Sequence, residues 1–392
     1  MVIPMTAEVV IGCRYGDEGK GLLTDYFAHR AVQSGKKTCT VFAAGAAQRG
    51  HTVVTPEGQT HVFRHIGSGT FAGADTYIAG NFIVSPMIFR EEWEELEKMG
   101  IHPTVYVNPS CIVTTPYDVY INQTVETMRG EDRHGSCGCG VWETIERNKK
   151  SDEPLTLQKL REFSRSTYFL YMKAIREQYL PRRIKEYDMT IPEKDSIFLS
   201  DWGADIDKVF MDDVNFFLDH VKLAEDDILT RYDHLVFENG QGLGLDPNYA
   251  EDKRHATPCS TGLKEPARLL AELETNTGSE IPTEVCYVMR TYETRHGKGF
   301  MWKESSREEL DIPADQTNVD NPWQGSLRYG ELPFACCVMT VNRDYFLHKS
   351  AHMTKAFAVT HTDEKCIPCW FSDLGANICY SSRGRTRNDI IN

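Results

Sequence analysis

The sequence predicts an α/β protein built on one large, mostly parallel sheet whose strands are joined by helical crossovers. Residues 8–90 alternate short apolar runs with glycine-rich turns and helical patterns, as strand–helix–strand units do. Buried-type strands return far along the chain, at Leu235–Phe237 and Val285–Met289. A chain of 392 residues is long enough to cover such a sheet on both faces. We therefore expect one domain over residues 1–392, with a charged helical subdomain at about 151–233.

The expected elements follow from apolar spacing and from the residues that end each run. Strands are short apolar runs closed by turn residues, and helices carry apolar residues three and four apart. In chain order we expect strands at Val9–Ile11 and Thr38–Phe42, a helix at Phe89–Met99, a strand at Val105–Asn108, a helix at Pro116–Arg129, strands at Leu235–Phe237 and Val285–Met289, and a last buried strand at Phe334–Val341.

The first strand leads into a glycine-rich turn, Val10–Gly21 (VIGCRYGDEGKG), that opens into a helical pattern. The glycines let backbone N–H groups converge on an anion, and the helix N-terminus adds a partial positive charge. Lys20 can reach a phosphate and neutralise its charge. The loop differs from a Walker A loop because it contains an acid, Asp17, where a phosphate would otherwise lie. A carboxylate there suits a metal ligand or a base, and a plain turn is the alternative for this loop taken alone. The residues predicted to form the phosphate loop are Gly16, Glu18, Gly19 and Gly21.

A second run of small residues, Ala43–Val54 (AAGAAQRGHTVV), follows the predicted strand at Thr38–Phe42. Together the two segments resemble the adenylosuccinate synthetase family, whose hallmarks are W-G-D-E-G-K-G and a later N-A-G-H-T. Tyr15 replaces the Trp of the first hallmark. In the second, Gln48 and Arg49 replace Asn and Ala, and Gly-His-Thr is kept.

Four further segments match the family's motifs in the same order. They are Ile66–Gly69 (IGSG), Ala79–Pro86 (AGNFIVSP), Phe237–Asp246 (FENGQGLGLD) and Arg290–Gly299 (RTYETRHGKG). Six ordered matches along the chain identify it as a member of the family. The resemblance implies the family's P-loop-related fold, Mg²⁺ as cofactor, GTP or ATP as co-substrate, a homodimer, and ligation of aspartate to a 6-oxopurine nucleotide.

The residues of the two hallmarks suit that chemistry. Activating the C6 oxygen of a purine requires a base for the N1 proton beside a phosphate loop, and Asp17 fits that base and a magnesium ligand. His51 fits the donor to the negative charge that develops at O6, and Lys20 neutralises phosphate charge. These roles match what the resemblance implies, which adds the backbone carbonyl of Gly50 as a second metal ligand.

The resemblance also implies a pocket for the purine nucleotide. An arginine that the neighbouring subunit lends in the family corresponds to Arg147 through a gapped match. The residues at the family's 5′-phosphate positions are Gln48, either Ser136 or Cys137, Gln241 and Thr257.

Two motifs of the family are altered. The family binds aspartate with an arginine-rich loop, G-R-R-R-R-x-G-W. This loop shrinks here to Gly325–Gly330 (GSLRYG), in which Arg328 is the arginine left to bind a carboxylate through two N–H groups. Arg295 and Arg49 are candidates to compensate. The guanine-reading T-K-L-D corresponds to Val341–Asp344 (VNRD), so the resemblance implies that Asp344 accepts hydrogen bonds from guanine.

The retained Asp344 favours GTP over ATP, although Asn342 replaces the Lys of that motif, and ATP and dATP stay open as donors. The C-terminal Tyr380–Gly384 (YSSRG) resembles the family's last nucleotide loop, S-T-G-P, and places Gly384 there.

The purine substrate is the open choice. Cellular members of the family convert IMP to adenylosuccinate, and a viral branch converts dGMP to 2-amino-2′-deoxyadenylosuccinate, a precursor of diaminopurine. The drift of the second hallmark and of the arginine loop favours dGMP, whereas the retained Asp17 favours IMP, and we lean narrowly to dGMP. A nucleotide-binding regulator without turnover is the alternative of another class.

Composition limits the partners. The net charge of −14 argues against general binding to nucleic acid or to an anionic membrane, and no apolar run is long enough to span one. The N-terminus lacks the pattern of a signal peptide. The 12 cysteines are scattered, and Cys366–Cys369 is a lone CxxC, so neither a disulfide framework nor zinc is favoured. We expect a cytoplasmic protein, in the host cytoplasm if the chain is viral.

Overall fold

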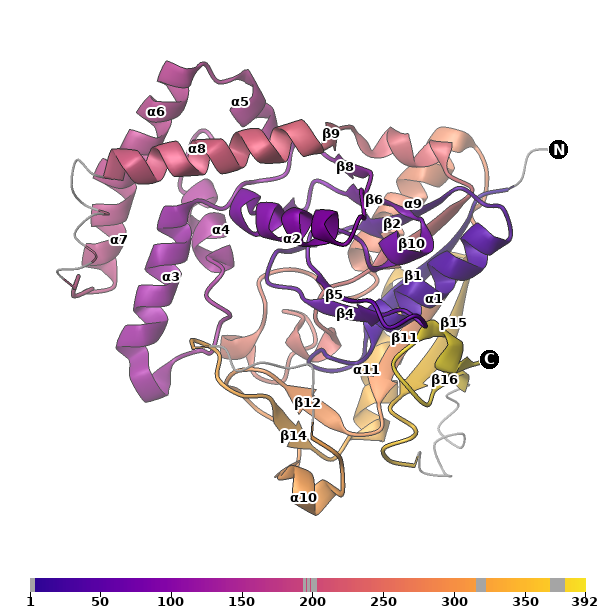
Figure 1. Cartoon of the computed structure of the whole chain (residues 1–392). Coiled ribbons are helices and arrows are strands. Elements are labelled where there is room, and N and C mark those ends of the chain that lie inside the picture. The colour runs from indigo at the N-terminus through magenta and orange to yellow at the C-terminus, as the bar shows by residue number, and fades with distance from the viewer. Residues whose placement is uncertain (1–3, 193–194, 196–197, 199–202, 315–321, 367–377) are drawn as a thin grey trace.

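The computed structural model describes residues 4–192, 195, 198, 203–314, 322–366 and 378–392, and a single large sheet runs through this part of the chain (Figure 1). Its neighbouring strands are parallel except for β16 and β17, which confirms the predicted fold class. From edge to edge the ten strands are β17 (Ile390–Ile391), β16 (Ile378–Ser382), β15 (Met353–Thr360), β11 (Thr283–Arg290), β1 (Thr6–Gly12), β10 (His234–Glu238), β2 (Thr38–Phe42), β6 (Asp75–Ile78), β8 (Val105–Val107) and β9 (Lys222–Leu223).

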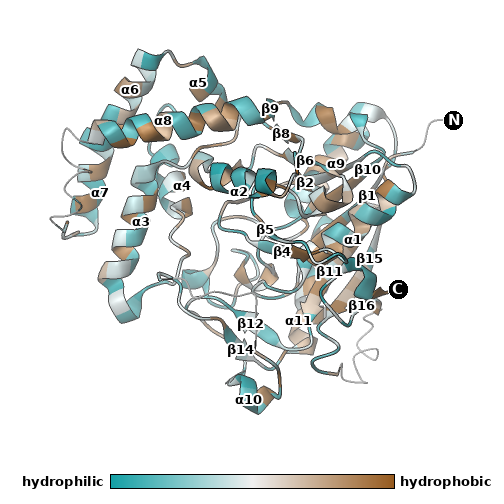
Figure 2. Cartoon of the chain, viewed as in Figure 1, coloured by the Kyte–Doolittle hydropathy of each residue, from teal (hydrophilic) through white to brown (hydrophobic). Residues whose placement is uncertain are grey.

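Helices bury both faces of the sheet. Alternate residues of the central strands point to opposite faces, so Val10 packs with Leu23 and Phe27 of α1, whereas Val9 packs in the core that holds α9 and α11. Figure 2 shows that α2 and α8 carry both hydrophilic and hydrophobic residues, as amphipathic covering helices do. The helices are α1 (Lys20–Gln33), α2 (Pro86–Lys98), α3 (Pro116–Arg129), α4 (Val141–Lys149), α5 (Leu157–Glu162), α6 (Arg165–Ala174), α7 (Leu180–Glu186), α8 (Gly203–His220), α9 (Lys264–Thr277), α10 (Arg307–Leu310) and α11 (Phe334–His348).

The helices α3 to α8 gather at one side of the sheet, to the left in Figure 1. Among them, α3 and α5 to α8 share one hydrophobic core with α2 and with the strands β6 and β8. The segment at about 151–233, where the sequence predicts a helical subdomain, holds α5 to α8, and α3 packs against both α4 and α7. The chain returns to the sheet at β9, so residues 222–233 belong with the sheet. The division into one domain with a subdomain stays a prediction.

Three small sheets lie beside the main one and carry loops of the site. An antiparallel sheet has the order β12, β14, β13, a parallel pair joins β3 to β7, and a hairpin pairs β4 with β5. Their bounds are β12 (Glu293–Arg295), β13 (Glu304–Ser305), β14 (Arg328–Gly330), β3 (Gly45–Ala46), β7 (Phe82–Ile83), β4 (His51–Val54) and β5 (Thr60–Phe63).

One predicted element is wrong. The apolar run Phe334–Val341 forms the first half of the helix α11, not a strand. Periodicity cannot separate a buried strand from a buried helix in a short, wholly apolar run. The buried positions Phe334, Cys337, Val338, Val341 and Tyr345 repeat every three to four residues, which is the helical period.

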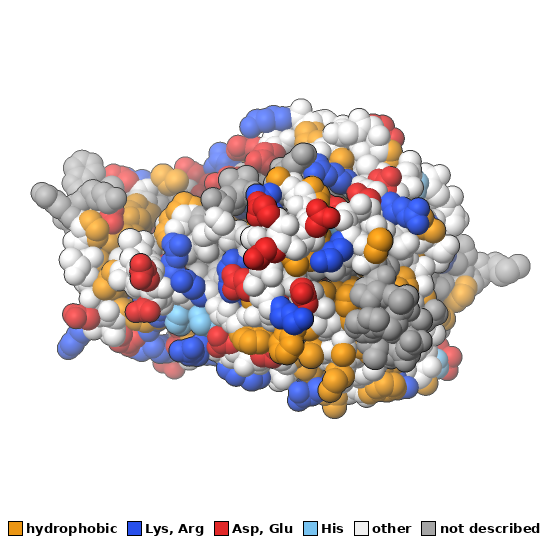
Figure 3. Space-filling model, turned by 90° about the horizontal axis from the view of Figure 1, so that it is seen from below, with side chains coloured by type: hydrophobic (Ala, Val, Ile, Leu, Met, Phe, Trp, Pro, Cys, Tyr) orange, Lys and Arg blue, Asp and Glu red, His pale blue; other side chains and the backbone are white. Residues whose placement is uncertain are grey.

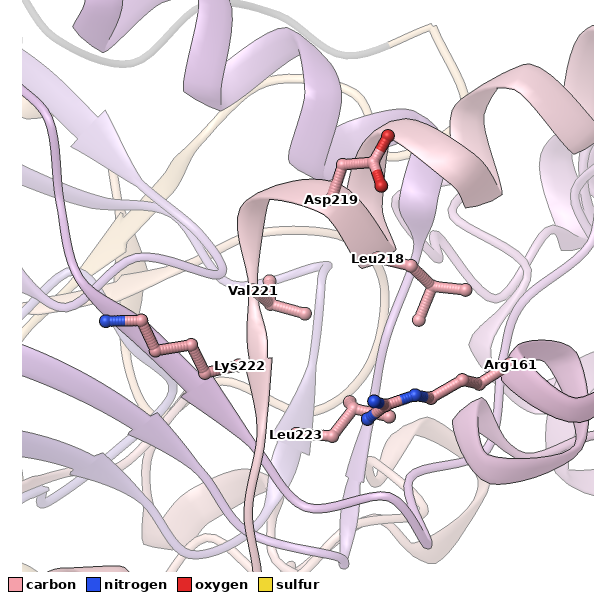
Figure 4. Close-up of a pocket in the computed structure, with 6 residues that line it drawn as sticks. All are labelled: Arg161, Leu218, Asp219, Val221, Lys222 and Leu223. Carbon is pink, nitrogen blue, oxygen red and sulfur yellow. The ribbon is translucent and has the colours of Figure 1, made fainter.

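A hollow of about 490 Å³ lies at the end of α8 and beside β9, at the edge of the main sheet (Figure 4). Its charged side chains do not converge, since Asp219 and Lys222 point away from one another and Arg161 lies beside Leu223. We assign it no function. In the described part of the chain, no helix has both the length and the apolar character that crossing a membrane requires.

Candidate active site

A pocket of about 1000 Å³ lies where the carboxyl ends of the central strands meet. Because β1, β2, β10, β11 and β15 run parallel, the loops that follow them open at the same edge of the sheet, where α/β proteins bind ligands. Figure 3 shows Lys, Arg and His side chains where the group of helices α3 to α8 meets the rest of the molecule. The predicted site residues that line the pocket are Gly16, Asp17, Glu18, Gly19, Lys20, Gly21, Gln48, Gly50, His51, Ser136, Cys137, Gln241, Thr257, Arg295 and Gly384.

The phosphate loop turns sharply between β1 and α1. Gly19 has φ of 88° and precedes the first helical residue, Lys20, in a left-handed conformation that glycine adopts without strain. A Cβ at Gly19 would lie 2.7 Å from the Thr360 side chain, which donates a hydrogen bond of 3.0 Å to the carbonyl of Glu18. The loop is therefore packed against the end of β15. Lys20 is buried beside the Glu18 carboxylate, 3.5 Å away, and lines the pocket.

Asp17 is held ionised at the centre of the pocket. Its carboxylate lies 2.8 Å from Nε2 of His296, and Arg290 donates a hydrogen bond to its backbone carbonyl. Burial by itself would raise the pKa of Asp17, but the hydrogen bond from His296 and the charge of Arg290 hold that pKa below its usual value. A carboxylate that is ionised at neutral pH can accept a proton or hold a metal ion.

His51 sits in a buried polar cluster at the start of β4. Its Nδ1 lies 2.5 Å from Oε1 of Glu238 and 2.8 Å from Nη2 of Arg49. Burial first, and then the charge of Arg49, lower the pKa of His51 to about 4. Burial alone would raise the pKa of Glu238, but Arg49 and His51 hold it at about 2. The ring is thus fixed through Nδ1, and the residue lines the pocket.

The glycine-rich loop between α3 and α4 brings a donor from the helical side. Asn122 of α3 holds this loop by donating to the Ser136 hydroxyl oxygen at 2.8 Å and accepting from the Gly140 backbone N–H at 3.0 Å. The hydroxyl hydrogen of Ser136 remains available to a ligand. Gly135 packs so closely against Gly297 that a Cβ would come within 2.7 Å of the Gly297 Cα. This contact brings the loop next to the segment that carries His296.

Two buried side-chain oxygens lining the pocket, Oε1 of Gln48 and Oγ1 of Thr257, have no hydrogen-bond partner among the described residues. Unpaired buried polar atoms are costly, so they indicate a polar ligand at this place. Both belong to the residues that the resemblance assigns to the nucleotide phosphate.

Asp344, the residue predicted to read the NTP base, does not line the pocket. The residue lies on the buried face of α11, fully enclosed, and its carboxylate accepts from the Leu263 backbone N–H at 3.0 Å and from the Tyr287 hydroxyl at 2.8 Å. Asn342 likewise lies on α11, where Lys355 donates to its amide oxygen, and does not line the pocket. At the end of β15, Thr360–Asp363 (THTD) instead stands beside the phosphate loop, and Asp363 lines the pocket.

The predicted aspartate clamp at Arg328 also does not reach the pocket. Its guanidinium pairs with both carboxylate oxygens of Glu304, at 2.8 and 2.5 Å, and donates to the Gly297 carbonyl at 2.9 Å. These contacts occupy the fork that a substrate carboxylate would need. Arg295 does line the pocket, with its guanidinium carbon 4.3 Å from the centre of the Tyr15 ring.

Arg147 is enclosed within its own subunit rather than presented to another one. Its side chain is 3% exposed and pairs with Asp118 at 2.9 Å, and it donates to the Val113 carbonyl at 2.7 Å. Asp118 in turn accepts from Thr115 in the capping box at the start of α3. These contacts occupy the guanidinium inside the chain, and the role that the gapped match gives Arg147 stays a prediction.

Sequence reasoning missed several residues that line the pocket or contact the residues lining it. Glu238, His296 and Arg290 lie inside segments that match the family, but nothing in their spacing indicated that they contact His51 or Asp17. Asp363 was missed because the strand before it, β15, is not among the predicted elements. The CxxC was not a site prediction: Cys366 is exposed, and Cys369 lies outside the described residues.

The sequence of this chain matches a known protein family. The sequence model of the adenylosuccinate synthetase family matches residues 9–318. The adenylosuccinate synthetase of Acaryochloris marina is 26% identical over 297 residues, which cover 75% of this chain and 62% of that protein. The enzyme so named in Neisseria gonorrhoeae is 27% identical over 302 residues, or 74% of this chain and 63% of its own length. The match thus spans about three fifths of these relatives.

Two solved structures share the fold over nearly the whole chain. A cyanophage S-2L succinoaminodeoxyadenylate synthetase, bound to dGMP and to dATP as an energy donor, superposes with a TM-score of 0.66 at 15% identity, covering 99% of this chain and 95% of that one. A fully ligated adenylosuccinate synthetase from Plasmodium falciparum superposes with a TM-score of 0.69 at 14% identity, covering 98% and 99%. At these identities the likeness shows the fold.

Proposed function

Because this chain belongs to the adenylosuccinate synthetase family, we propose that it is a ligase that joins the amine of L-aspartate to C6 of a purine nucleotide at the expense of an NTP. The observation that carries the proposal is the convergence of Asp17, Lys20 and His51 on one pocket at the ends of the central strands. A pocket of about 1000 Å³ has room for more than one small ligand.

The proposed reaction has two steps. Asp17 takes the N1 proton, and O6 attacks the γ-phosphorus of the NTP, whose bond to the bridging oxygen breaks to release the nucleoside diphosphate. The aspartate amine then attacks C6, inorganic phosphate leaves with O6, and the amine gives up a proton. Lys20 offsets charge on the transferring group, and His51 faces the oxygen where negative charge grows.

Mg²⁺ fits the oxygen donors of the pocket. Asp17 and Gly50 both line it and can offer a carboxylate and a backbone carbonyl, and Mg²⁺ is typically held by one or two carboxylates together with phosphate oxygens. These two residues would hold the ion, which would neutralise phosphate charge when bound. The homodimer and the cytoplasmic location remain predictions that follow from the resemblance.

For the purine substrate we favour dGMP, with IMP as the alternative. Three observations support dGMP: Gln48 and Arg49 replace the Asn and Ala of the family hallmark, the arginine-rich loop is reduced, and a fold neighbour is described as bound to dGMP. The retained Asp17 supports IMP, although both substrates present the same N1–H and C6=O edge.

We predict that kcat/KM for dGMP exceeds that for IMP by at least about tenfold, which corresponds to about 1.4 kcal/mol of transition-state discrimination. A site that hydrogen-bonds the 2-amino group leaves its own polar atom unpaired when that group is missing. The measurement is phosphate release with aspartate, Mg²⁺ and GTP or ATP, run with dGMP and IMP in parallel. Turnover of IMP alone would point to adenylosuccinate synthesis, and no turnover of either would support a non-catalytic regulator.

For the phosphate donor we favour GTP, with ATP and dATP as alternatives, and we assign base recognition to Asp363 in place of Asp344. Asp363→Asn should change the GTP:ATP ratio of kcat/KM by about tenfold, because a carboxylate accepts two guanine N–H groups and an amide accepts only one. Asp344→Asn is the matched control: it should lower the melting temperature and leave the donor ratio within about twofold. The opposite pattern would return base recognition to Asp344.

A further inference from the structure

Arg49 precedes Gly50 and His51, and its guanidinium is turned into the protein. The residue is 4% exposed, and the guanidinium carbon lies 3.8 Å from the centre of the Phe42 ring. Its Nη2 lies 2.7 Å from Oε1 of Glu238 and 2.8 Å from Nδ1 of His51. One nitrogen of Arg49 therefore touches both members of the Glu238–His51 pair.

Glu238 is the anchor of this arrangement. It is fully buried at the end of β10 and accepts from the backbone N–H of Ser68 at 3.0 Å and from the Ser68 hydroxyl. A buried carboxylate needs a counter-charge in contact with it, because removing a charge from water is costly. Arg49 is the permanently charged group in contact with Glu238, and the ammonium of Lys20 pairs instead with Glu18.

The Arg49 guanidinium has no free pair of N–H groups with which to bind the carboxylate of the aspartate substrate. A carboxylate is gripped by two parallel N–H groups, and each such fork of an arginine includes Nη1 or Nε together with Nη2. Nη2 is already in contact with Glu238 and His51, so Nε and Nη1, which are buried with no hydrogen-bond partner in the described part of the chain, can each give a ligand only a single hydrogen bond. No fork is left for a substrate carboxylate.

We infer that Arg49 is a positioning residue for His51: it neutralises Glu238 and clamps the Glu238–His51 pair, so that the ring presents its Nε2 edge to the substrate oxygen. The inference rests on the proposed ligase function. The family hallmark has Ala at this place, so a third member of the cluster is a feature of this chain.

The test is a kinetic double-mutant cycle on the full chain with Arg49→Met, Glu238→Gln and the double variant. Arg49→Met should lower kcat by about 10- to 100-fold, by analogy with partners that orient metal-bound histidines, and change the KM values for aspartate, purine nucleotide and NTP by less than about threefold. Arg49→Lys should recover part of kcat, because an ammonium can still pair with Glu238. When Glu238→Gln is already present, adding Arg49→Met should lower kcat by less than about a further twofold.

Arg64→Met is the matched control, because Arg64 also lines the pocket but has no contact with Glu238. In the double variant of Arg64→Met and Glu238→Gln, the two fold losses in kcat should multiply. A rise in the aspartate KM with kcat unchanged in Arg49→Met would show a substrate ligand and overturn the inference. Fully multiplicative losses for Arg49→Met and Glu238→Gln would also overturn it.

Thermal melting keeps the inference testable if the chain turns over no purine nucleotide, in which case the proposed function fails separately. Arg49→Met leaves Glu238 without its permanent counter-charge and should lower the melting temperature, and the double variant should melt higher than Arg49→Met because it buries no unpaired carboxylate. Additive losses in melting temperature would mean that Arg49 and Glu238 are not coupled, and the clamp would be wrong.

Discussion

Asp17→Asn should lower kcat by about 10²–10⁴-fold, the range that a general base contributes. The amide keeps the shape of the side chain but cannot take up the N1 proton of the purine. Asp17 has φ of 55°, and Asn adopts this left-handed conformation more readily than most residues, so the phosphate loop should keep its structure. The measurement is steady-state phosphate release, together with a thermal melt of the same preparation.

Asp188→Asn provides a matched control for this prediction. Asp188 also has a left-handed backbone, with φ of 52°, but it is exposed after α7 and does not line the pocket. The same chemical change there should leave both kcat and the melting temperature as in the wild type. Activity near the wild-type level in Asp17→Asn would remove Asp17 from the role of base.

Arg147→Met should lower the free energy of unfolding by about 3–5 kcal/mol, because it leaves the buried carboxylate of Asp118 without its partner. Asp118 is fully buried and also closes the N-terminal cap of α3. The loss is measured by urea unfolding. The fraction that remains folded should keep the wild-type KM for the purine nucleotide, since Arg147 does not line the pocket.

An exposed ion pair gives the comparison for Arg147. Arg90 pairs with Glu94 and Asp213 at the surface of α2, with 39% of its side chain exposed, and Arg90→Met should cost less than about 1 kcal/mol. If Arg147→Met instead keeps its stability and loses nucleotide affinity, the arginine serves a neighbouring subunit after all. That result would contradict the enclosed position described above.

The local sequence pattern predicted some helices and strands correctly and one of them wrongly. Thr38–Phe42 and Pro116–Arg129 are confirmed to the residue, because turn residues bound the first and a Thr-Pro capping signal begins the second. Phe334–Val341 failed because every residue of the run is apolar except one threonine, so that neither period is visible. The residue predicted to read the NTP base, Asp344, lies on the same helix and does not line the pocket.

Arg147 and Arg328, two predicted site residues, do not line the pocket, and the cause is different. Arg147 and Arg328 were matched by their place in a motif, and both guanidiniums are occupied by carboxylates of the same chain, Asp118 and Glu304. A charged side chain goes to the nearest partner that the fold supplies, and those partners lie 29 and 24 residues away in sequence. Local sequence carries no information about such pairs.

By itself the sequence determined the phosphate loop, the parallel sheet and the family, because glycine spacing and apolar runs are local properties that survive in the order of residues. The tertiary structure alone decided that Asp17 meets His296, that His51 shares Glu238 with Arg49, and that Asp363 faces the pocket while Asp344 does not. The physical reason is that these contacts join loops from different parallel strands. Only the closing of the sheet brings those loops to one edge, and the burial that follows sets the charge of each group.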